Sequence, residues 1–229
     1  MSRRRIKWFR LPLERAQLRT LANAMTAMPY NARRGHGFVL DEVRPSSVAG
    51  RHVEKVEREI VGLDPFGEET KQTVTTFVHA NFNLTTVAPG LEVIDAPRSL
   101  KMLISQISAL ANFEVALTEM EADPLLWLAA VEANDTQALV KEVEYADISF
   151  RGGTTGALTV RAVTDVRDAG NKIVGDRPKT VRRVEASLQR ASLPATDVTL
   201  ERDGKAQIPA EALDTFRDFL RVALVAAGK

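Results

Sequence analysis

Apolar and polar residues alternate most clearly between Val48 and Leu84, where two charged segments flank the turn signal Asp64-Pro65-Phe66-Gly67. After the turn, Val74 and Val78 alternate with polar neighbours, which is the period of a half-buried strand. The segment before it, 51–63, also fits the spacing of a helix. We favour a strand there, because strands joined by a short turn commonly pair. The pattern therefore predicts one long, charged β-hairpin over 48–84.

Helical spacing of apolar residues predicts the helices. The clearest runs begin near a proline or after a capping aspartate, and most of them present one apolar face. They cover 13–28, 98–112, 124–134 and 210–226. We expect Asp123 to cap the third of these helices, and we expect a further helical turn around 166–174.

Shorter alternating segments predict the remaining strands, while the segment 181–188 fits either a strand or a helix. The predicted strands cover 6–11, 38–43, 91–94, 113–120, 143–150 and 157–164, with a tight turn at Asp203-Gly204 before a final strand. Repeated hairpins mixed with four to five helices argue for an α+β fold with a mainly antiparallel sheet. We interpret the 229 residues as one compact domain. The alternative is two subdomains divided near residue 96, with a strand-rich 1–96 and an α+β 97–229.

The bulk composition is that of an ordinary globular protein, with 45% hydrophobic and 27% charged residues. Cysteine is absent, which excludes thiolate chemistry and cysteine-bound zinc and is compatible with a reducing compartment. No apolar run reaches the length that spans a bilayer. We expect a soluble cytoplasmic protein that makes no membrane contact. Its richness in Ala, Val and Arg indicates a bacterial source.

The net charge of +1 hides an uneven distribution. Residues 1–40 hold nine basic and one acidic residue (+8), 41–147 hold eight and nineteen (−11), and 148–229 hold fourteen and ten (+4). A basic arm beside an acidic middle pairs either with that acidic region, in the same chain or another copy, or with an anionic partner such as nucleic acid. Because the total is close to neutral, we favour internal or protein–protein neutralisation.

Two candidate surfaces follow from this charge distribution. The leading hypothesis is a non-enzymatic subunit that binds itself or partner proteins through the long hairpin, with its charged and apolar residues in contact. These residues are Glu54, Glu57, Glu59, Phe66, Glu68 and Glu69. The alternative is a nucleic-acid-binding protein whose basic residues contact phosphates. Its candidate residues are Arg3, Arg4, Arg5, Lys7, Arg33, Arg34, Arg182 and Arg183.

Catalytic chemistry finds little support in the sequence. If the loop centre lies between Pro65 and Phe66, His52 and His79 face each other across the hairpin as a weak candidate metal or acid–base pair. Asp64 with Glu69-Thr70-Lys71 loosely matches the acidic and E-x-K elements of metal-dependent nucleases, but these residues fall at a solvated hairpin tip. The loop 152–156 lacks the lysine of a phosphate-binding loop. We expect no enzyme, cofactor, resident metal or small-molecule ligand.

Overall fold

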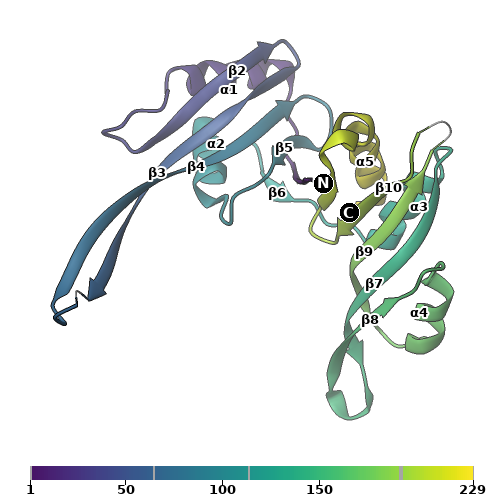
Figure 1. Ribbon diagram of the computed structural model, residues 1–229. Coiled ribbons are helices and arrows are strands. Elements are labelled where there is room, and N and C mark those ends of the chain that lie inside the picture. The colour runs from purple at the N-terminus through teal and green to yellow at the C-terminus, as the bar shows by residue number, and fades with distance from the viewer. Residues whose placement is uncertain (1, 64, 113, 191–192, 229) are drawn as a thin grey trace. The chain divides into compact units, whose positions relative to one another are not determined.

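The computed structural model describes residues 2–63, 65–112, 114–190 and 193–228, which divide into two compact units. Unit 1 combines residues 1–10 with 118–229, and unit 2 comprises 11–117. The described residues contain five α-helices and eleven strands (Figure 1), and every pairing between the named strands described below is antiparallel. The predicted α+β fold with a mainly antiparallel sheet is therefore confirmed.

Unit 2 is an antiparallel sheet of order β2-β3-β4-β5 with two helices. Its elements are α1 (Arg15–Thr26), β2 (His36–Arg44), β3 (Ser47–Leu63), β4 (Glu69–Thr85), β5 (Gly90–Ile94) and α2 (Lys101–Leu110). Helix α1 begins with a reciprocal capping box, in which Glu14 and Gln17 each accept from the other's backbone N–H. Its apolar stripe then faces β2, β3 and α2.

The core of unit 2 occupies only the inner part of this sheet. Buried side chains of α1, β2, β3, β4 and α2 meet there, including Leu18, Leu21, Met25, Phe38, Val48, Phe82, Leu84, Leu103 and Ile107. At Gly90, φ is 110° and a Cβ atom would lie 1.9 Å from the carbonyl oxygen of Leu11, so only glycine fits this turn. The long β3–β4 hairpin continues well beyond this core (Figure 1).

Unit 1 is built on strands in the order β1-β11-β10-β9-β7-β8, with β6 paired to β1. Its strands are β1 (Arg3–Arg10), β6 (Thr118–Glu119), β7 (Gln137–Ser149), β8 (Thr155–Arg161), β9 (Thr180–Gln189), β10 (Thr196–Glu201) and β11 (Lys205–Pro209). Its helices are α3 (Pro124–Glu132), α4 (Arg167–Val174) and α5 (Leu213–Ala227), with 3₁₀ turns η1 (Arg151–Gly153) and η2 (Ala210–Ala212).

One face of the unit 1 sheet is covered by α3 and α5 and forms the larger core. Trp8 and Trp127 are both fully buried and meet edge to face, with ring centroids 5.9 Å apart. The indole Nε1 of Trp127 donates to the carbonyl oxygen of Leu220 at 2.9 Å, so the polar atom of this large side chain is satisfied inside the core. As expected, Asp123 caps α3, accepting from the backbone N–H groups of Leu125 and Leu126.

Most predicted elements are present, including the 48–84 hairpin and the strand at 51–63, while 181–188 lies in β9. The strand predicted at 113–120 is wrong except for Thr118–Glu119. Val115 is buried between exposed neighbours, so its alternation reflects burial without the pairing that defines a strand. Helix α2 begins at Lys101, later than the predicted 98.

The boundaries between the units differ from the split near residue 96. They follow Arg10 and Leu117, so α2 belongs with the long hairpin and β1 belongs with the C-terminal half. Burial explains the position of β1, because Ile6 and Trp8 complete the core of unit 1. No helix among the described residues is long and apolar enough to cross a membrane.

Candidate functional site

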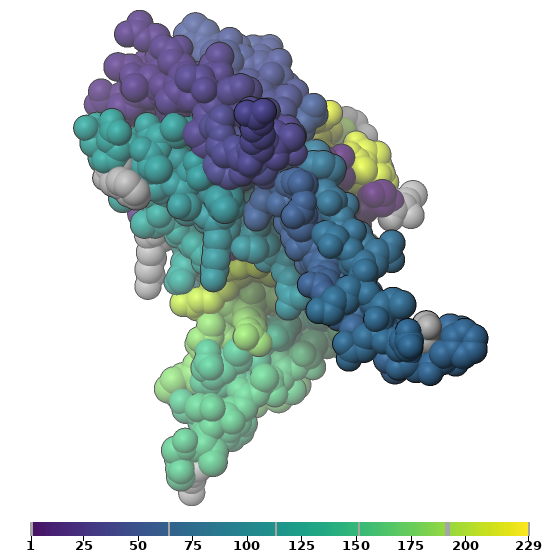
Figure 2. All heavy atoms as spheres, turned by 90° about the vertical axis from the view of Figure 1, so that its left-hand side faces the viewer, coloured from purple at the N-terminus to yellow at the C-terminus, as the bar shows by residue number. Residues whose placement is uncertain are grey.

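The β3–β4 hairpin has an inner part inside a sheet and an outer part with no neighbouring strand among the described residues. Its two strands pair from Ser47↔Thr85 to Leu63↔Glu69 without a register shift. Strand β2 follows β3 only as far as Glu54, and β5 follows β4 only over Asn81–Leu84. We call the unflanked part, residues 56–79, the arm. In Figure 2 it forms much of the blue projection at the right.

The two open edges of the arm differ in charge. The β3 side carries Glu57, Arg58 and Glu59, and charged side chains of this kind protect an edge strand from pairing with another chain. The β4 side carries no Asp, Glu, Lys or Arg from Gln72 to Ala80. It also has no proline and no bulge, the other features that protect edges. The β4 edge of the arm is therefore the unprotected edge.

Apolar side chains continue from the core onto one face of the arm. Directly paired residues share a face of a hairpin, and alternate residues along a strand share it too. Val48 and His52 occupy the core face of β3 and are buried, and Val56 and Ile60 continue that face outwards. Ile60 is 54% exposed. The core-type face of the hairpin thus continues onto the arm, where Val56 is half-buried and Ile60 is exposed.

The end of the arm is both apolar and acidic. Leu63 is 73% exposed and Phe66 is 91% exposed. Glu68 and Glu69 follow and are exposed, whereas Asp64 lies outside the described residues. We call Leu63, Phe66, Glu68 and Glu69 the tip. All six residues predicted to bind a partner protein thus lie on the hairpin, three of them at its tip.

Glu57 and Glu59 of the arm form ion pairs with lysines of the same hairpin. Lys55 Nζ lies 2.5 Å from Glu57 Oε1, and this hydrogen bond raises the pKa of Lys55. Lys71 Nζ lies 3.1 Å from Glu59 Oε1 across the two strands. Lys71 is therefore engaged with β3. The lysine of the nuclease-like Glu69-Thr70-Lys71 motif thus has a carboxylate partner on β3.

The predicted His52–His79 pair is wrong. His79 is opposite Val53, and His52 is opposite Ala80. The true register differs by one residue from the predicted one, and such a slip places two side chains on opposite faces. His52 instead lies near His36, with ring centroids 6.2 Å apart, and is packed edge to face against Phe38.

Burial governs the chemistry of His52. Desolvation, with a smaller contribution from the nearby His36, lowers the pKa of His52 to about 4. The ring is therefore neutral at physiological pH. No group of three or more potential metal ligands occurs among the described residues. His52 thus forms part of a packed core, whereas His79 is exposed on the arm.

The predicted nucleic-acid-binding residues fall into two groups in different units. Arg3, Arg4, Arg5 and Lys7 lie on β1 and Arg182 and Arg183 on β9, all in unit 1, whereas Arg33 and Arg34 are exposed in the loop before β2 in unit 2.

Several members of the first group are neutralised within unit 1. Lys7 is largely buried, 2.7 Å from Glu119 and 3.5 Å from Asp203. Arg182 and Arg183 each lie 3.6 Å from a glutamate of β7. Arg3 donates to the carbonyl oxygen of Asp197. These contacts leave less positive charge for phosphates than the sequence indicates.

The glycine-rich loop 152–156 joins β7 and β8 through a 3₁₀ turn, in which Gly152 and Gly153 have φ of 81° and 74°. The backbone conformation thus accounts for these glycines, because positive φ is strained in other residues.

Sequence reasoning missed two hollows, one in each unit. A groove of about 620 Å³ in unit 1 is lined by residues of both signs, among them Glu144, Arg182 and Asp203. A groove of about 570 Å³ in unit 2 lies between α1 and the β2–β3 turn. Arginines line the second groove together with apolar residues, and only the tertiary structure brings α1 to that turn. We call it the arginine groove.

Comparison with known proteins adds no function to this description. No protein-family model matches the chain, and no curated protein is detectably similar to it in sequence.

Proposed function

We propose that this chain is a non-enzymatic subunit of a protein assembly, joined to other chains through the arm of its β3–β4 hairpin. The single observation that carries the proposal is the open β4 edge of the arm, which has no Asp, Glu, Lys or Arg from Gln72 to His79. Such an edge presents unpaired backbone N–H and C=O groups, to which a strand of another chain adds by main-chain hydrogen bonds.

The stability of the arm supports the same function. A two-stranded hairpin without further strands or a covering helix is marginally stable in water. The arm nevertheless keeps continuous pairing and carries an exposed Ile60 on its core-type face. A third strand beside β4 would extend this face and lower the cost of ordering the arm.

A pair of substitutions on β4 tests the proposal. Thr73 is opposite Glu59, and Thr75 is opposite Glu57. The double variant Thr73→Lys, Thr75→Lys places two lysines on the open strand while offering each a carboxylate within the hairpin. We expect the assembly formed by the full-length protein to dissociate, as measured by size-exclusion chromatography with light scattering.

The matched control is Thr73→Val, Thr75→Val, which keeps the strand uncharged and should leave the assembly intact. Amide hydrogen exchange adds a local measurement, since residues 72–78 should exchange more slowly in the assembly than in the double-lysine variant. A wild-type protein that stays monomeric and purifies from its native cells without partners would contradict the proposal.

A further inference from the structure

The arginine groove of unit 2 has an apolar floor and a positively charged rim. Leu18, Ala22 and Val48 are buried residues of its lining. Its volume of about 570 Å³ lies within the range of roughly 300–1,000 Å³ typical of binding pockets. Arg15 and Arg19 also line it, from the exposed side of α1. The groove therefore suits an apolar group that carries negative charge.

Two of the groove's arginines lack acidic partners in the described part of the chain. Arg15 and Arg19 are four residues apart on α1, a spacing at which like charges repel, and neither forms an ion pair with a described residue. The third, Arg44, lies 2.5 Å from Glu42. An anionic group beside α1 would relieve the repulsion between the first two.

The tip of the arm has the complementary chemistry. Among the described residues of unit 2, Phe66 and Leu63 are the two most exposed large apolar residues, and Glu68 and Glu69 follow them. An aromatic side chain buries roughly 150–250 Å² when it enters a pocket. The tip thus combines an apolar anchor, which suits the apolar floor of the groove, with two carboxylates, which suit its positively charged rim.

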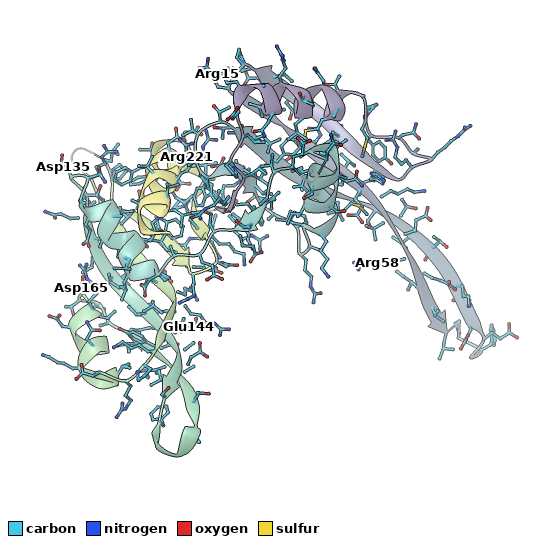
Figure 3. All side chains as sticks on the ribbon, turned by 180° about the vertical axis from the view of Figure 1, so that it is seen from behind. Arg15, Arg58, Asp135, Glu144, Asp165 and Arg221 are labelled. Atoms are coloured by element: carbon cyan, nitrogen blue, oxygen red, sulfur yellow. The ribbon has the colours of Figure 1, made fainter. Side chains whose placement is uncertain are left out.

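A tip cannot enter the groove of its own chain. Val48, in the groove, lies near the start of β3, and Leu63, at the tip, is its last residue. Most of the 17-residue strand separates them, roughly 50 Å at about 3.3 Å per residue. Figure 3 shows Arg15 on α1 and Arg58 part-way along the hairpin, whose end lies farther from α1 still. Any contact between tip and groove must therefore join two molecules.

We infer that the arginine groove receives the hairpin tip of a second copy of this chain. Phe66 enters between α1 and the β2–β3 turn, and the tip carboxylates lie against Arg15 and Arg19. Each copy has one tip and one groove, so a mutual exchange between two copies closes a two-fold dimer. The inference rests on the proposed function, because it identifies one partner of the arm as the chain itself.

Charge reversal with rescue tests this contact. The groove variant is Arg15→Glu, Arg19→Glu, and the tip variant is Glu68→Arg, Glu69→Arg. We expect each to weaken self-association at low salt by roughly tenfold or more, measured by sedimentation velocity of the full chain. An equimolar mixture of the two variants should associate again, because each tip then faces a groove of opposite charge. Phe66→Ala should weaken self-association by roughly 10- to 100-fold.

A matched control separates this contact from a general effect of charge. Arg98→Glu, Lys101→Glu makes the same change in net charge as the groove variant, at exposed positions of unit 2 outside the groove, and should leave self-association unchanged. Far-UV circular dichroism should be the same for all variants, because the substituted charged residues are exposed.

The outcomes distinguish this inference from the proposed function. Unchanged association in the reversed variants, or no recovery in their mixture, overturns the tip–groove contact. If the double-lysine variant of β4 still dissociates the assembly in that case, the proposed function stands without it. Binding of an acidic peptide to the groove of a wild-type chain that never self-associates would also overturn the inference.

Discussion

Charged strands occur in both units, but their surroundings differ. In unit 1, β9 has a neighbour on each side, and Arg183 reaches Glu142 on β7. Lys141 of β7 reaches Asp197 of β10 at 2.7 Å. On the arm of unit 2, the ion pairs stay within the hairpin. The charged residues of a strand inside a sheet thus pair with residues of other strands. The arm, by contrast, retains one edge and one face for contacts with another molecule.

The largest expected effect is a loss of stability when the packed core of unit 1 is disrupted. Trp127→Ala removes the contact with Trp8 and the hydrogen bond to Leu220, and we expect it to destabilise unit 1 by about 3–5 kcal/mol. Ile60→Ala on the arm should cost less than about 1 kcal/mol, since Ile60 is 54% exposed. Urea denaturation measures both losses. Similar losses for the two variants would mean that the arm is packed in solution.

The second prediction concerns the point where the hairpin leaves the core. The pKa of His52 is about 4 in the folded chain and about 6.5 in the unfolded chain, so the unfolded state binds the proton more readily. The stability associated with neutral His52 is complete above pH 6.5 and is lost as the pH falls towards 4, by about 3 kcal/mol at most.

Denaturation of wild type and His52→Gln at pH 7.5, 5.5 and 4 measures this effect. The variant should lose less stability than the wild type between pH 6.5 and 4, because its residue 52 does not titrate. Equal losses over this interval would show that another group is responsible.

The third prediction concerns an ion pair inside the sheet of unit 1. Glu142 is nearly buried and contacts both Arg161 and Arg183, and its hydrogen bond raises the pKa of Arg161. Glu142→Gln should lower the free energy of unfolding by about 1–2 kcal/mol, because a charged hydrogen bond is lost at a carboxylate that is itself shielded from water, although Arg161 is exposed. Thermal unfolding measures the change, and a shift no larger than that of an exposed variant would contradict it.

The smallest effect is expected for the matching ion pair on the arm. Glu59 and Lys71 are each more than half exposed, so water screens their attraction. Glu59→Gln should therefore change stability by about 0.5 kcal/mol or less in the same thermal assay. A loss of stability as large as that of Glu142→Gln would show that ion pairs on the arm stabilise the chain as much as those in the sheet of unit 1.

The patterned elements were the predictable part of this fold. The 48–84 hairpin, the cap at Asp123 and the turn at Asp203-Gly204 each depend on residues close together in the chain. The register of the hairpin was not predictable to one residue. The positions of Pro65 and Phe66 do not define the centre of the loop, and a shift of one residue separated His52 from His79.

The candidate sites divide in the same way. The exposed charges and Phe66 of the hairpin were identifiable because its alternation and its turn are local features. The ion pairs of Lys7 and Arg183 could not be predicted from the sequence, because their partners Glu119 and Glu142 are distant in sequence. The arginine groove was missed for the same reason, since α1 and the β2–β3 turn meet only in the folded unit.

By itself, the sequence determined the long hairpin, the helices and the uneven charge, because periodicity, capping and composition act over a few residues. The tertiary structure decided which charges are neutralised, that β1 belongs with the C-terminal half, and that one edge of the arm remains open. Those properties depend on which distant segments become neighbours, and burial of a shared core selects these neighbours.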